Sequence, residues 1–331
     1  MKQGINRFNF FLDQLQVLLT KASKQKNPGL WLYRNNARTP LFMLEALAKM
    51  YSALHNKKRF CKMKERFKLL EDIIGAIDYY DAFAKEFSAN KNIPASVTSY
   101  LQAQSREKIQ SLNEALKENE WLTVRMKKIR KRLTEMDWEN EANEVKDIKK
   151  YYEKAIAEII AFGTSSDFKF TNVESDVHEL RRKLRWLSIY PQALHGTIQL
   201  TNSLKKEATL PKYLQKYLTP EIVNSPFNKM PDAGDNSIFL LLEQNYFLAL
   251  SWMIAELGKL KDGGLRLIAI KEALQQAGSV SDEEALYKAR EFIGGEQMTL
   301  DDVLANANSL TKTYFTEKNL EKLTKGIGST S

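Results

Sequence analysis

Glycine and proline are scarce in this chain, at 14 and 8 of 331 residues, and this scarcity limits the possible folds more than any other feature. Sheet proteins with many tight turns usually need more of both residues. Good helix formers such as Leu, Ala, Lys, Glu and Gln are plentiful, and we find no convincing alternating strand pattern. We therefore predict an all-α fold with helices over residues 4–24, 40–56, 58–89, 95–118, 120–137, 140–162, 173–190, 192–206, 237–260, 263–277, 282–294 and 310–325.

Short local signals indicate where these helices begin and end. Typical helix starts occur at Thr39-Pro40, Ser96 and Ser175, and typical stops at Asn27-Pro28-Gly29 and Gly163. Two loops are expected, one over residues 162–171 and a longer one, rich in proline, over residues 219–236. The first loop divides the chain into halves of similar length, residues 1–165 and 166–331, which suits one large domain or two halves.

Composition indicates the compartment and the class of partner. The single cysteine, Cys61, cannot form a disulfide or a cysteine metal site within one chain. The first residues lack the pattern of a secretion signal, and no uncharged stretch approaches the roughly 18 residues that a membrane helix needs. We therefore expect a cytoplasmic protein with no membrane partner. A net charge of +9 favours polyanionic partners.

The most informative segment is DVHELRRKLRWLSIY, residues 176–190. On a helical wheel, one stripe of roughly 100° holds a histidine, three arginines and no acid: His178, Arg181, Arg182 and Arg185. The leucines of the segment fall on the opposite face. Arginine donates paired hydrogen bonds to phosphate and keeps its charge, so the stripe indicates a site for phosphate anions. The alternative is a solvated basic face with extended side chains.

This segment resembles the signature helix of the CHAD domain, the conserved histidine α-helical domain, which reads approximately His-x-x-Arg-x-x-x-(Arg/Lys)-(Arg)-x-Arg. His178, Arg181 and Arg185 match the first fixed positions. Trp186 and Ser188 depart from the pattern, because bases usually stand there. A later segment is similar to the family's second signature, Leu-Gly-x-x-Arg-Asp, at Leu257, Gly258, Lys261 and Asp262, with lysine in place of arginine.

The resemblance implies an internal repeat: two antiparallel helical bundles related by a pseudo-twofold, each carrying both signatures. Residues 1–165 would then be a degenerate first repeat and residues 166–331 the repeat with the His/Arg helix, together forming one CHAD-like unit. In the first repeat Leu41, Leu44 and Ala48 stand where the histidine and the two bases would be. Gly75 is retained, but Asp78 and Tyr79 replace the Arg-Asp pair.

The resemblance further implies that the protein binds inorganic polyphosphate or a similar polyanion through a basic helical surface. We expect Lys261 to join the stripe, and Asp262 to orient a neighbouring base. The densest basic run, residues 55–68, could supply the first half's share of the polyanion-binding surface through Lys58, Arg59, Lys62 and Arg66. That run could also be a solvated face. The basic segment 125–132 has charge all around the helix, which is typical of a surface helix.

Catalysis has little support in the sequence. The three histidines are far apart, at positions 55, 178 and 195, and we find no phosphate-binding glycine loop, dinucleotide fingerprint or zinc-protease helix. We therefore expect a non-catalytic protein without metal or cofactor. Two other interpretations remain open. A degenerate CHAD-like scaffold could bind a protein partner, and a nucleic-acid binder is less favoured because no nucleic-acid motif accompanies the charge.

Overall fold

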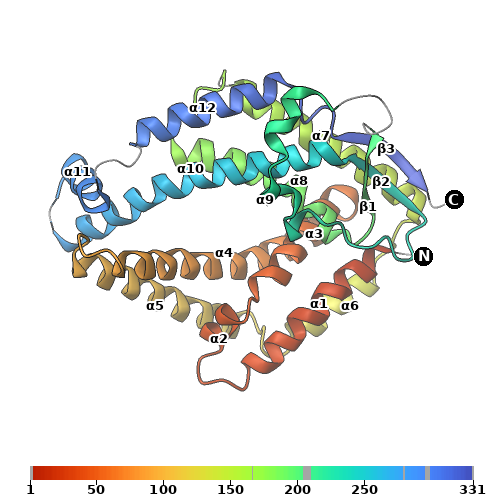
Figure 1. Ribbon diagram of the computed structural model, residues 1–331. Coiled ribbons are helices and arrows are strands. Elements are labelled where there is room, and N and C mark those ends of the chain that lie inside the picture. Colours follow the sequence, from red (N-terminus) through yellow and green to blue (C-terminus); the bar gives the residue numbers. More distant parts are fainter. Residues whose placement is uncertain (1–2, 166, 204–209, 279, 295–298, 330–331) are drawn as a thin grey trace.

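The chain forms long helices with a small sheet at one end, as the computed structural model in Figure 1 shows. The structure describes residues 3–165, 167–203, 210–278, 280–294 and 299–329. Of the described residues, 74% are helical, which confirms the prediction of a mostly helical protein. The long helices are α1 (Gln3–Ala22), α2 (Pro28–Arg34), α3 (Arg38–Leu54), α4 (Lys57–Ser88), α5 (Ala95–Glu118), α6 (Arg125–Thr134), α7 (Glu141–Ser165), α8 (Glu179–Ala193), α10 (Gln244–Ala277), α11 (Asp282–Ile293) and α12 (Leu300–Thr316).

Shorter elements connect them. These are the π-helical turn η1 (Val173–His178), the 3-10 turns η3 (Lys212–Tyr217) and η4 (Pro226–Asn228), the short helix α9 (Pro220–Val223), and the strands β1 (Ile198–Thr201), β2 (Ile238–Glu243) and β3 (Thr324–Ser329). No helix in the described ranges is long and apolar enough to cross a membrane.

Side-chain caps explain several of the helix starts. The Asn56 side chain accepts a hydrogen bond from the Arg59 backbone N–H and begins α4. Thr299 and Asp302 form a reciprocal capping box at the start of α12. Asn27 accepts from the Leu30 backbone N–H, so Asn27-Pro28-Gly29 begins α2, and our interpretation of these residues as a stop was incomplete.

Two predicted breaks differ in the structure. We predicted separate helices over 237–260 and 263–277, but α10 continues through both without interruption from Gln244. The two glycines at 263 and 264 therefore do not end the helix, because neighbouring elements pack along it. The 219–236 insert, predicted to be non-helical, contains α9 and η4.

The prediction that the chain contains no strands is wrong. β1 pairs parallel with β2, where Ile198 faces Leu240, and β2 pairs antiparallel with β3, where Leu240 faces Ile327. The predicted helix over 192–206 fails because His195 and Gly196 take positive φ values of 45° and 93°, and a Cβ on Gly196 would lie 2.3 Å from the Asp232 carbonyl oxygen. The predicted helix over 310–325 instead begins at Leu300, ends at Thr316 and gives way to β3.

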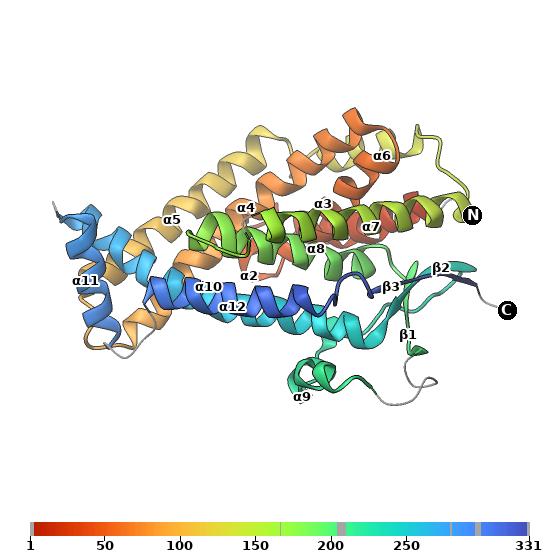
Figure 2. The ribbon, with the colours of Figure 1, turned by 90° about the horizontal axis from the view of Figure 1, so that it is seen from above.

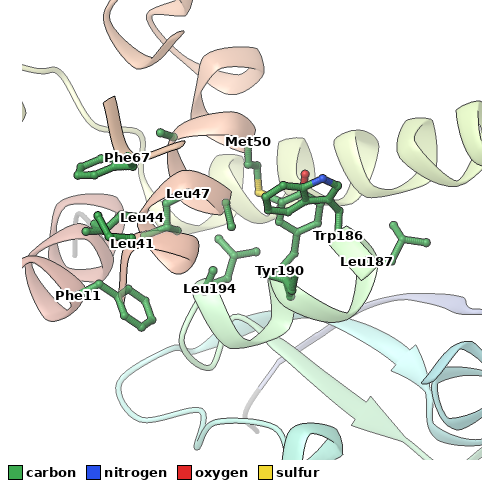
Figure 3. Packing of buried hydrophobic residues seen from close by; sticks show 14 of the residues in the cluster. Phe11, Leu41, Leu44, Leu47, Met50, Phe67, Trp186, Leu187, Tyr190 and Leu194 are labelled. Atoms are coloured by element: carbon green, nitrogen blue, oxygen red, sulfur yellow. The ribbon is translucent and has the colours of Figure 1, made fainter. Parts of the chain in front are cut away.

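One large core joins the two halves of the chain. Its buried residues run from Phe8 to Leu323, and Figure 3 shows Trp186 and Tyr190 of α8 near Met50 and Leu47 of α3. A second, smaller core lies at the far end, where α4 and α5 meet α10 and α11 (Figure 1). Residues from both halves fill each core. The two-bundle arrangement and the division at residue 165 remain predictions.

Hydrogen bonds also join the halves at opposite ends of the molecule. At the end near α11, the Glu272 carboxylate of α10 accepts from the Tyr80 and Tyr100 hydroxyls at 3.0 and 2.7 Å. At the sheet end, the Glu141 carboxylate of α7 accepts from the Ser237 and Ile238 backbone N–H groups at 2.6 and 3.1 Å. Figure 2 shows that α11 and the sheet lie at opposite ends.

A buried ion pair lies near the start of α1. Arg7 and Glu144 are 2.8 Å apart, and their side chains are only 3% and 4% exposed. The Arg7 guanidinium also donates to Tyr51 Oη at 2.6 Å and to Thr197 Oγ1 at 2.8 Å. The pair therefore connects α1, α3, α7 and the segment that leads into β1.

Candidate anion-binding site

The His/Arg helix begins with an unusual turn. The Asn172 side chain accepts from the backbone N–H groups of Glu174 and Ser175, and the Asp176 carboxylate accepts from those of Thr171 and Asn172. These bonds hold the π-helical turn η1, from which α8 continues. The leucines at 180, 184 and 187 of α8 are fully buried. The arginines of the opposite face line hollows together with residues of α3, α4 and α10.

That basic face lines a cleft between α3 and α8. The larger hollow of the cleft has a volume of about 480 Å³ and is bounded by α3, α8, α10 and the α9–η4 segment. A smaller hollow of about 190 Å³ adjoins it toward the start of α8. Both hollows are lined by Arg38, Phe42, Glu71, Arg181 and Arg185. His178 and Arg182 line the smaller one, so the structure brings all four stripe residues together at one cleft.

Arg181 and Arg185 face the cleft without an acidic partner among the described residues. Arg181 Nε donates to the Ile254 carbonyl oxygen at 3.1 Å, and the Arg185 guanidinium lies 4.6 Å from the centre of the Phe42 ring. Burial, and then the charges of Arg181 and Arg38, lower the pKa of Arg185 to about 10, while the charge of Glu71 opposes this fall. Burial also lowers the pKa of Arg181, while Asp262 raises it. Both charges are thus desolvated and lack a contacting carboxylate, and Asp262 and Glu71 compensate them only partly.

The other two stripe residues are neutralised locally. Arg182 Nη2 lies 2.6 Å from the Glu179 carboxylate, and His178 Nδ1 lies 2.8 Å from that of Glu174. The helical wheel correctly placed no acid on the stripe. However, Glu174 of the preceding turn η1 pairs with His178, and Glu179, which stands beside the stripe at the first position of α8, pairs with Arg182.

Arg38 is a cleft residue that the sequence analysis missed. It lies at the first turn of α3, where its Nε is 2.7 Å from Glu71 and its Nη1 is 3.4 Å from Asp78. Its guanidinium packs over Gly75, where a Cβ would lie 2.8 Å from Nη2. The residues that we compared with the signature positions, Leu41, Leu44 and Ala48, are buried in the core instead.

The same kind of packing occurs in the second half. A Cβ at Gly258 would lie 3.1 Å from Arg181 Nε, so this glycine provides space for Arg181 as Gly75 does for Arg38. The similarity between the segments around the two glycines was visible in the sequence, and a search for an arginine to pair with each glycine would have found Arg38.

The smaller hollow has a mixed charge. Glu45 of α3 lines it and is only 5% exposed. Burial, and then the nearby charge of Glu71, raise the pKa of Glu45 to about 7. Burial lowers the pKa of Lys49 to about 8, and its Nζ lies 4.3 Å from the centre of the Trp186 ring. A cation from α3 therefore lies over Trp186, the first position where α8 departs from the signature.

The remaining predicted site residues do not line the cleft. Lys58, Arg59 and Lys62 are exposed near the start of α4, and Lys58 lies roughly 20 Å along the helix from Glu71. Arg66 is half-buried, and after burial the charges of Arg125 and Arg132 lower its pKa, which indicates a separate basic cluster with α6. Lys261 pairs with the adjacent Asp262 at 2.8 Å and is absent from both hollows.

Comparison with known proteins does not indicate a function for the cleft. No model of a protein family matches the chain, and no curated protein matches it. Within the described ranges, no group of three or more His, Cys, Asp and Glu residues could hold a metal ion. What the cleft offers chemically is a pair of guanidinium groups, already desolvated, beside apolar side chains.

Proposed function

We propose that this protein binds a phosphate-bearing anion, without catalysis, in the cleft between α3 and α8. Polyphosphate, which the resemblance to CHAD domains implies, is the first ligand to test. One observation supports the proposal above the others: in the described part of a chain that has 41 acids, neither Arg181 nor Arg185 forms an ion pair, although Asp262 and Glu71 lie near enough to act on their charges. A bound phosphate would supply the missing counter-charge and the missing acceptors.

The binding energy in this proposal comes from charge-assisted hydrogen bonds. Each such bond contributes roughly 1.5–3 kcal/mol, and more when the cation is already desolvated, because less water must then be removed on binding. Arg38 would contribute less, since Glu71 already occupies its Nε. Affinity should fall steeply with salt, as expected for polyanions that release counterions.

The test compares two double variants with equal loss of charge. Arg181→Met/Arg185→Met removes the unpaired cations of the cleft, and Lys58→Met/Lys62→Met removes two exposed cations outside it. Titration calorimetry with polyphosphate should show a loss of roughly a hundredfold or more for the cleft variant and a loss of about threefold or less for the α4 variant.

Three results would oppose the proposal. Equal losses in the two variants would indicate diffuse attraction to the whole basic surface. Tighter binding of duplex DNA or RNA than of polyphosphate at matched salt would favour a nucleic-acid binder. If none of these anions binds, the result would favour a scaffold that binds a protein partner.

A further inference from the structure

The larger hollow of the cleft is only partly basic. Its arginines occupy one side, while the other is formed by apolar side chains from four elements: Phe42 and Met43 of α3, Ile189 of α8, Ile254 of α10, and Ile222 and Phe227 of the α9–η4 segment. Phe227 is 81% exposed at the rim. A bare inorganic polyanion would leave this apolar surface in contact with water.

The α9–η4 segment is held firmly over the hollow. Gln192 of α8 donates to the Lys229 carbonyl oxygen at 2.8 Å. Asn228 is 9% exposed, accepts from the Ser251 hydroxyl of α10 and donates to the Ile222 carbonyl oxygen at 2.8 Å. The apolar side is therefore preformed, as in sites for small organic ligands, and a volume of about 480 Å³ lies within the range of such sites.

The charge of the hollow also sets a limit. It is lined by three arginines and one acid, Glu71, and Arg38 pairs with that acid. Two positive charges remain, on Arg181 and Arg185, and they equal the charge of one phosphate monoester dianion. A longer polyanion that extended into the adjoining hollow would meet the carboxylates of Glu45 and Asp72. Two cations of that hollow already have acidic partners, since Lys68 pairs with Asp72 and Arg182 with Glu179.

We propose that the cleft takes an organic phosphate: a phosphate monoester held by Arg181 and Arg185, whose apolar body packs against Ile254 and Phe227. This inference rests on the proposed anion-binding function and specifies the class of ligand. The phosphate end would satisfy the uncompensated charge, and the body would cover the apolar side that an inorganic anion leaves exposed.

The test uses four probes in calorimetry: methyl phosphate, 1-naphthyl phosphate, tripolyphosphate and 1-naphthol. The first two carry the same phosphate group and differ in the apolar body. We expect 1-naphthyl phosphate to bind at least about tenfold more tightly than methyl phosphate, because a ring system leaves water on binding. 1-Naphthol, which has the body without the charge, should bind at least about tenfold more weakly than 1-naphthyl phosphate.

A pair of variants on one segment locates the apolar contact. Phe227→Ala should weaken the binding of 1-naphthyl phosphate about fivefold and leave the affinity for methyl phosphate unchanged within about twofold. Val223→Ala is the control, because Val223 is 49% exposed on α9 but does not line the hollow. Val223→Ala should change the affinity for neither ligand. Both side chains are on the surface, so neither change should unfold the protein.

The outcomes separate this inference from the proposed function. If tripolyphosphate binds and the two monoesters bind equally, the inference is wrong and the anion site stands. An equal loss of both monoesters in Phe227→Ala would also overturn the inference. If none of the phosphate probes binds, both proposals fail.

Discussion

Replacing Arg185 with methionine should make the protein more stable and a poorer binder. The side chain is largely buried, forms no ion pair in the described structure, and has a pKa lowered from 12.5 to about 10 even though Glu71 opposes the fall. That fall corresponds to a cost of about 3 kcal/mol for keeping the charge in place. The contact with the Phe42 ring offsets about 1 kcal/mol. Methionine keeps the apolar contacts of the stem, so we expect a net gain of about 2 kcal/mol in the free energy of unfolding.

The pH dependence of this gain can be stated in advance. Arginine is protonated in both the folded and the unfolded protein below about pH 10, so the penalty is fully present throughout neutral pH. The gain from Arg185→Met should therefore be constant between about pH 6 and pH 9 and should shrink only at higher pH. Urea unfolding followed by circular dichroism measures it directly.

Arg182→Met provides the matched control. Arg182 belongs to the same stripe, but its side chain is 54% exposed and pairs with Glu179, so its loss should change stability by less than about 0.5 kcal/mol. A loss of stability in Arg185→Met larger than in the control would refute the reasoning, because it would mean that the buried guanidinium is satisfied in the folded protein.

Further predictions concern the surroundings of the cleft. Glu45→Gln should raise stability at pH 8 by up to about 3 kcal/mol, since the pKa of about 7 makes the buried carboxylate costly; urea unfolding should show the gain vanish as pH falls from about 7 to 4.5, and a gain that persists at pH 4.5 would contradict this cause. Gly263→Ala should stabilise α10 by about 0.5–1 kcal/mol, because a Cβ there meets nothing within 4 Å. Gly258→Ala should gain less than Gly263→Ala, because Arg181 must shift away from the new Cβ, and calorimetry should show about threefold weaker phosphate binding for Gly258→Ala alone; equal binding by the two variants would count against the packing of Arg181 over Gly258. Glu144→Gln leaves Arg7 buried without its counter-charge and should cost about 3–5 kcal/mol in urea unfolding, whereas a cost under about 1 kcal/mol would show that Tyr51 and Thr197 suffice.

The sequence indicated the helices and the basic stripe because both depend on local periodicity. Residues 176–190 carry the stripe within a few turns, so a helical wheel was enough to place Arg181 and Arg185 on one face. The strands were missed for the opposite reason. Residues 238–242 are rich in leucine, a good helix former, and their partners in β1 and β3 lie far away along the chain, so pairing overrides the local preference.

The cleft residues that we did not predict belong to other helices than the one that carries the stripe. Arg38 precedes Pro40, where the predicted helix over 40–56 begins, so it fell outside that helix and was not weighed as a site residue. Glu45 belongs to the apolar face of α3 and was not considered as a site residue, although it lines the smaller hollow and has its pKa raised to about 7 there. Conversely, Lys58, Arg59 and Lys62 are close to one another in sequence but distant from the cleft, because α4 is 32 residues long.

The hydrogen bonds that join the two halves determine how a ligand can enter. The cleft lies between α3 of one half and α8 of the other, and the halves are joined at one end through Glu272 and at the other through Glu141. Separation of the halves by a hinge would have to break these bonds, whereas an exposed rim side chain such as Phe227 rotates in nanoseconds or less. We therefore expect a ligand to enter without separation of the halves. Binding should then be fast and should leave the backbone in place, with the affinity set by the rate of departure.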